Sequence, residues 1–159
     1  MGFKEELEAR RQREEAKRYF RQNNPYYFSS QTWTKLILVG LALSLGCGLA
    51  YGLFTMMVHI QFSYILSMIG IVIAKRLKKI SGVGNEKLGI LTVILYFISL
   101  IFSHVMSIVC FNVMIGGSFM VLFNPAVWLS GAMSLFTGSI ISSLFYVVGA
   151  VYAYNYACQ

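Results

Sequence analysis

Apolar residues run through most of this chain in long stretches that charged residues seldom interrupt. The last 72 residues, Leu88 to Gln159, contain no Asp, Glu, Lys or Arg. A water-soluble domain of this length needs charged surface, whereas a charge at the centre of a membrane helix costs about 2.5–3.5 kcal/mol. The pattern therefore predicts an all-α integral membrane protein.

Four stretches qualify as membrane spans, at about residues 36–58, 60–77, 88–110 and 133–153. A helix needs about 20 residues to cross the hydrocarbon core, with about 17 as the lower limit. The second stretch is the shortest, and it crosses only if Leu77 and the snorkelling side chains of Lys75 and Arg76 extend it. We predict a four-transmembrane-helix bundle.

The whole chain divides into three segments. Residues 1–24 form a charged helical arm, residues 25–35 an aromatic interfacial segment, and residues 36–159 the transmembrane domain. Within that domain, residues 111–129 are too apolar for an ordinary loop and too close to the third span to be a fifth one. We expect them to be re-entrant or interfacial on the outer side, as a plug over the bundle or as the lining of a pore.

Charge sets the expected orientation. Twelve of the nineteen charged residues lie between Met1 and Arg21, and most of the others lie between the second and third spans. By the positive-inside rule both termini are cytoplasmic. The arm is either a solvated helix or a docking site for a partner or for anionic lipid, and its docking candidates are Arg10, Arg11, Arg13, Lys17 and Arg18. Its net excess of two positive charges is too small to indicate nucleic-acid binding.

Small residues recur on the predicted spans at the spacing of one helix face. The first span carries them every four residues and includes a Gly-x-x-x-Gly pair, and the third and fourth spans repeat the device with serine and glycine. Small side chains let membrane helices approach closely enough for dispersion and weak hydrogen bonds to hold them. The expected packing residues are Gly40, Ser44, Gly48, Gly52, Ser99, Ser103, Ser107 and Gly138. They pack either within one chain or between copies of it.

Residues able to support chemistry are scarce within the spans. His104 is the one ionisable His, Asp, Glu, Lys or Arg of the third span, and an ionisable group at such a position is by default a functional candidate. We expect either a neutral histidine bonded to a neighbouring serine or carbonyl, or a pore or ligand site with Ser103, Ser107, Gly116 and Gly117.

No catalytic, metal or cofactor site is predicted. Cys47, Cys110 and Cys158 form no Cys-x-x-Cys pair and have no acid or imidazole at ligand spacing. No nucleophile elbow or phosphate-binding loop is present in the sequence. The lack of acidic residues in the spans also argues against a proton- or sodium-coupled transporter.

Three stretches of this chain resemble a pattern in uncharacterised bacterial four-span membrane proteins. The stretches run from Tyr64 to Lys75, from Leu77 to Gly82 and from Leu88 to Tyr96, and the ending from Gly149 to Tyr154 is also similar. The second glycine that those proteins carry beside the basic run is Ala74 here. The resemblance implies four spans with cytoplasmic ends in a bacterial cytoplasmic membrane, and it implies no activity.

These observations favour a non-enzymatic membrane protein that acts as an assembly or scaffold subunit. Its expected partners are the lipid bilayer, copies of itself or a larger membrane complex, and a cytoplasmic protein bound through residues 1–22. The alternative is a small homo-oligomeric pore or solute facilitator lined by Ser99, Ser103, His104 and Ser107.

Overall fold

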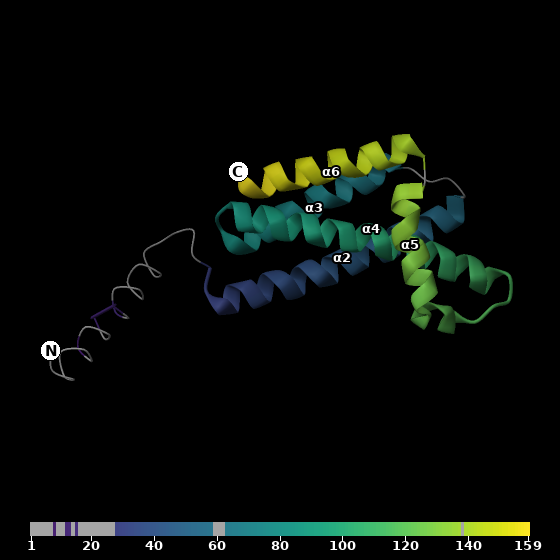
Figure 1. Ribbon diagram of the computed structural model, residues 1–159, viewed down its shortest axis with the longest axis horizontal. Coiled ribbons are helices and arrows are strands. Elements are labelled where there is room, and N and C mark those ends of the chain that lie inside the picture. The colour runs from purple at the N-terminus through teal and green to yellow at the C-terminus, as the bar shows by residue number, and fades with distance from the viewer. Residues whose placement is uncertain (1–7, 9–11, 14, 16–27, 59–62, 138) are drawn as a thin grey trace.

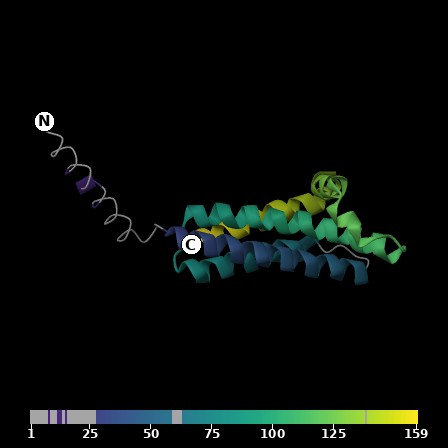
Figure 2. The same cartoon turned by 90° about the horizontal axis from the view of Figure 1, so that it is seen from below.

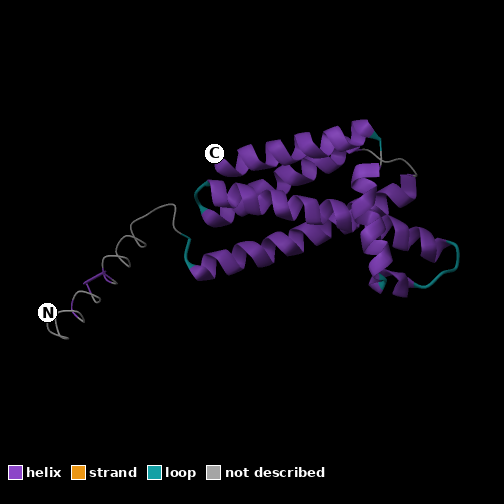
Figure 3. Cartoon of the chain, in the orientation of Figure 1, coloured by secondary structure: helices purple, strands orange, loops and turns teal. Residues whose placement is uncertain are grey.

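The computed structural model describes residues 8, 12–13, 15, 28–58, 63–137 and 139–159. These residues are mostly helical, with short loops between the helices, and they contain no strand (Figure 3). Five α-helices follow one another, α2 (Ser30–Val58), α3 (Ser63–Ser81), α4 (Glu86–Met114), α5 (Pro125–Thr137) and α6 (Ile140–Cys158), with a short 3-10 helix, η1 (Phe119–Phe123), between α4 and α5. The predicted all-α class is confirmed for this part of the chain.

Three of these helices are long and apolar enough to cross a membrane. They are α2, α4 and α6. At about 1.5 Å per residue, the 29 residues of α2 and of α4 would each extend about 44 Å, which exceeds a hydrocarbon core of about 30 Å. Helix α3 has 19 residues but carries four basic residues near its end.

Four helices lie side by side along the long axis of the molecule (Figures 1 and 2). Successive helices among α2, α3, α4 and α6 run in opposite directions, so α2 and α4 begin at the end of the bundle where α3 and α6 finish. We call this the charged end, because Lys35, Lys78 and Lys87 lie near it and Leu88 to Gln159 carry no charge. We call the opposite end the far end.

Helix α4 is the centre of the bundle, since α2, α3, α5 and α6 all pack against it. Its buried residues lie on several faces, and Tyr96, Leu100 and Val105 are fully enclosed. Asn85 caps its first turn by accepting a hydrogen bond from the backbone N–H of Leu88 at 2.7 Å. The core of the bundle is therefore built around α4 rather than around a central cavity.

Helix α5 lies across the bundle at the far end (Figures 1 and 2). Gly131 of α5 packs against Val105 of α4, and the Trp128 and Phe102 rings lie 6.0 Å apart between the two helices. The Trp128 indole N–H also donates to the carbonyl of Leu122, at 2.8 Å, which ties η1 to α5. Residues 111–129 thus form the end of α4, η1 and the start of α5, and whether they lie at a membrane interface stays a prediction.

The element boundaries differ from the expected ones most clearly in the last span. A single helix was expected over about 133–153, whereas Met133 belongs to α5, which ends at Thr137, and α6 runs from Ile140 to Cys158. The other three helices overlap their predicted spans and extend past them, α2 and α4 by several residues.

Candidate functional site

The small-residue stripe of α2 packs against α4 of the same chain. Ser44 is buried, and its hydroxyl donates to the carbonyl of Gly40 at 2.8 Å. A side chain added at Gly48 would place its Cβ 2.8 Å from the Ser99 carbonyl oxygen, and one at Gly52 would lie 2.8 Å from the Cβ of Met106. The two backbones are therefore so close that α4 covers the stripe, and a second copy of the chain cannot use it unless the pair separates.

The three serines of α4 face this contact with α2. Ser99 is fully buried beneath Gly48, and its hydroxyl has no hydrogen-bond partner among the described residues. Ser103 donates to the carbonyl of Leu100 at 2.7 Å, while the hydroxyls of Ser107 and Thr55 of α2 lie 3.0 Å apart. Ser107 thus reaches a hydroxyl of α2, whereas the Ser103 hydroxyl is bonded within α4.

His104 lies on a different face of α4, toward α6. Its Nε2 is 3.4 Å from the Tyr146 hydroxyl, and the two rings meet edge to face with centroids 6.2 Å apart. Gly116 and Gly117 lie beyond the end of α4, so they are roughly 15 Å or more from His104 along the helix axis. The residues expected to form one pore or ligand site are therefore divided among three places.

The contact between His104 and Tyr146 is expected to contribute little to stability. A distance of 3.4 Å is at the long end of the hydrogen-bond range, and interhelical hydrogen bonds in membranes average about 0.6 kcal/mol. The coupling energy between His104→Ala and Tyr146→Phe in a double-mutant cycle should therefore be less than about 1 kcal/mol. Thermal unfolding of the two single variants and the double variant in mild detergent measures this coupling. A coupling of several kcal/mol would instead show that the pair holds α4 and α6 together.

Glycine occupies the loop after α4 for a conformational reason. Gly116 has φ of 86°, in the left-handed region that glycine favours. Gly117 packs against the amide of Asn112, whose Nδ2 donates to the carbonyl of Ser118 at 3.1 Å. Both glycines shape an exposed turn at the far end. Gly138, expected to contribute to helix packing, lies outside the described residues.

The arm is largely outside the described residues. Of the five docking candidates only Arg13 is described, in a helical and exposed position, whereas Arg10, Arg11, Lys17 and Arg18 are not. The predicted arm helix and its docking role stay predictions.

A second small-residue contact, between α3 and α6, was not predicted from the sequence. Gly70 and Ala74 of α3 and Gly149 and Ala153 of α6 are all buried. A Cβ at Gly70 would lie 3.0 Å from the Cβ of Ala153, and a Cβ at Gly149 would lie 2.8 Å from the Cα of Ser67. The signal was present as small residues four apart, which is the spacing that lets membrane helices approach.

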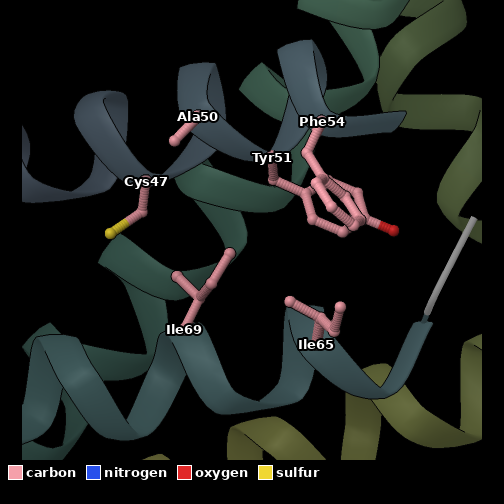
Figure 4. Close-up of a pocket in the computed structure, with 6 residues that line it drawn as sticks. All are labelled: Cys47, Ala50, Tyr51, Phe54, Ile65 and Ile69. Atoms are coloured by element: carbon pink, nitrogen blue, oxygen red, sulfur yellow. The ribbon is translucent and has the colours of Figure 1, made fainter. Parts of the chain in front are cut away.

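An apolar groove runs between α2 and α3 (Figure 4). Its volume is about 330 Å³, and its lining residues are Cys47, Ala50, Tyr51, Phe54, Ile65 and Ile69. The groove can accept an apolar side chain or an acyl chain, because aliphatic and aromatic carbon dominates its walls. It offers no arrangement of acid, base and nucleophile.

Among the described residues, no three His, Cys, Asp or Glu side chains lie close enough together to hold a metal ion. Cys47, Cys110 and Cys158 are free thiols on three separate helices. Comparisons with protein-family models, with characterised proteins and with solved structures find no significant match. What bears on the function of this chain is therefore its own packing and charge.

Proposed function

We propose that this chain is a non-enzymatic polytopic membrane protein that acts as an assembly or scaffold subunit. The helix bundle anchors it in the bilayer, and the charged arm recruits a cytoplasmic partner. The observation that carries this proposal is that several buried hydroxyls of the bundle are already bonded within it. Ser44 and Ser103 donate to carbonyls of their own helices, and Thr55 of α2 meets Ser107 of α4. The arm, with twelve of the nineteen charged residues, is then the part of the chain best suited to a soluble partner.

The charged end of the bundle favours a cytoplasmic location for both termini. Six basic residues follow the arm, and all of them are on α2, α3 or α4 near this end. Basic residues in short connections favour the cytoplasmic side. The start of α2 and the end of α6 lie at the same end (Figure 1), so the arm and the C-terminus would emerge together in the cytoplasm.

We also propose that α3 is the fourth membrane span. It lies antiparallel to α2 and packs chiefly along α6, which is itself apolar enough to span. Its uncharged part, Ser63 to Ala74, would extend only about 18 Å. Buried Leu77 and long basic side chains that reach toward the headgroups supply the remaining length.

The docking role is tested by the mass of the native assembly after gentle solubilisation, with proteomics on whatever co-purifies. The full chain is compared with a full-length variant in which Arg10, Arg11, Arg13, Lys17 and Arg18 are replaced by Gln. We expect a partner in stoichiometric amount with the native chain and its loss from the variant, because charge-assisted contacts to the arm are removed. The unfolding temperature of the bundle should be the same for both proteins.

Two results would contradict this assignment. A partner that stays bound to the arm variant would mean that the arm does not dock. A pure homo-oligomer with no partner would favour the pore interpretation, and ion or solute flux through liposomes would then become the deciding measurement.

A further inference from the structure

The exposed face of α3 has an apolar part and a cationic part, one after the other. Tyr64, Met68 and Val72, which are 51%, 57% and 48% exposed, recur every four residues and therefore share one side of the helix. Lys75, Arg76 and Lys79 continue that side over the next two turns and are also exposed. The opposite side packs into the bundle through Leu66, Ile73, Ala74 and Leu77. Tyr64 to Lys79 is hence an outward stripe, apolar toward the far end and basic toward the charged end.

The basic part of the stripe is hollowed. Val72, Lys75, Arg76 and Lys79 line a depression of about 370 Å³. The remaining cation of the helix is engaged elsewhere, because the Lys78 ammonium lies 5.5 Å from the centre of the Tyr156 ring of α6. Among the described residues no carboxylate pairs with the three cations of the hollow, and Glu86, the one acid of the described bundle, lies beyond the end of α3. The hollow thus gathers positive charge with no internal counter-ion in that part of the chain.

Two of these cations, Lys75 and Arg76, lie deeper along the bundle than the other basic residues. Leu77 of α3 packs against Gly40 of α2, where a Cβ would lie 3.4 Å from its Cδ2. Lys35 is five residues nearer the charged end than Gly40, which is about 7.5 Å along the helix axis. Lys75 and Arg76 precede Leu77 on the antiparallel α3, so they lie deeper still. Cations at such a depth are costly unless an anion accompanies them.

We propose that the hollow binds the phosphate of an anionic phospholipid, with Lys75, Arg76 and Lys79 holding the headgroup and an acyl chain lying along Val72, Met68 and Tyr64. A free phosphate would contact only the cations, whereas a phospholipid would contact both parts of the stripe. Its phosphate would lie at the basic residues and its acyl chain at the apolar residues, in the order in which they follow one another along α3. Basic pockets on the cytoplasmic side of membrane proteins bind anionic headgroups by the same physics. The inference rests on the membrane location proposed above, but it requires neither assembly nor docking by the arm.

The test is native mass spectrometry of the full chain released from vesicles that hold equal parts of phosphatidylglycerol and phosphatidylcholine with the same acyl chains. The native protein should retain phosphatidylglycerol in preference to phosphatidylcholine. The Arg76→Gln/Lys79→Gln variant should lose roughly thirtyfold of that preference, because two cations near the headgroup are removed. The matched control is Lys35→Gln/Lys87→Gln, which removes the same charge from exposed positions on α2 and α4 and should keep the preference.

Each other outcome overturns the proposal. If both double variants lost the preference for phosphatidylglycerol equally, the protein would have only a general attraction to anionic membrane. If the native chain showed no preference, the site would not exist, and this result does not depend on whether a variant folds. Displacement of the lipid by inorganic phosphate would identify a site for a soluble anion instead. Because neither variant changes the arm, co-purification of a partner should be unaffected, so failure of this proposal is distinguishable from failure of the docking proposal.

Discussion

Replacing Gly48 and Gly52 together with Leu is expected to separate α2 from α4 and to leave little folded protein. Each new side chain would have to enter a space where even a Cβ lies 2.8 Å from the facing helix, against backbone at Gly48 and against the Cβ of Met106 at Gly52. Overpacking costs typically about 1–3 kcal/mol per site in a core that can adjust, and α4 can adjust little because four helices pack on it. Thermal unfolding and the yield of monodisperse protein in mild detergent measure the effect.

Gly46→Leu is the matched control, since it makes the same change on the same helix. Gly46 is exposed, and a Cβ there would meet no atom within 4 Å. We expect its unfolding temperature to stay within a few degrees of the native value, since surface substitutions usually change stability by less than about 0.5 kcal/mol. If Gly48→Leu/Gly52→Leu stayed folded and lost only an oligomer, the small-residue stripe of α2 would act between chains. The packing of α2 against α4 described above would then be contradicted.

Gly149→Ala is expected to be the second most damaging change, although it adds a single methyl group. That methyl would lie 2.5 Å from the Tyr96 hydroxyl oxygen and 2.8 Å from the Cα of Ser67, so α6 would have to move away from α3 and α4 together. The cost should be about 1–3 kcal/mol, as for other overpacked sites. Unfolding of the purified protein by heat or by a denaturing detergent measures it.

A double-mutant cycle with Tyr96→Phe identifies which contact destabilises the Gly149→Ala variant. The Tyr96 hydroxyl is buried and has no hydrogen-bond partner among the described residues, so its removal alone should be neutral or slightly stabilising. In the Gly149→Ala background the same removal should recover part of the lost stability, because one of the two close contacts disappears. Strictly additive effects would mean that the Ser67 backbone alone limits the approach. Val151→Leu, at an exposed position of α6, is the control for a larger side chain.

The sequence predicted most of the helices because charge and hydropathy change sharply at their ends. Helix α2 begins after the charged arm of the sequence, and the turn near Asn85, which follows the basic residues at the end of α3, separates α3 from α4 as expected. The change from α5 to α6 was missed because nothing polar enough to stop a membrane span stands between Thr137 and Ile140, and glycine and serine are common inside such spans. Helix α5 crosses α4, against which it packs through Gly131, so the chain has to turn before α6 can run along the bundle. A hydropathy pattern shows how apolar a helix is, but not the angle at which it packs.

The candidate site residues were identified as small and polar, but their partners were not. Gly48, Ser99 and Ser103 were expected to pack, and the sequence left open whether they do so in one chain. Periodicity tells which residues share a face, whereas the facing helix depends on how the whole bundle assembles. Gly70 and Gly149 were overlooked because the repeats that they begin continue with alanine, whereas the predicted stripes consist of glycine and serine. His104 and Ser103 are neighbours in sequence, and so necessarily point to different sides of α4.

The order in which the helices pack differs from the order in which they are made. Helix α2 packs chiefly along α4 and helix α3 along α6, so neither of the first two helices has its main partner beside it in sequence. During synthesis α3, the most basic of the four, is complete while α4, η1, α5 and α6 are still to come. Until then it lacks the tight contact at Gly149 that holds it against the bundle. Truncation before Ile140 would therefore affect α3 as well as α6, because α3 would lose the helix against which it packs most.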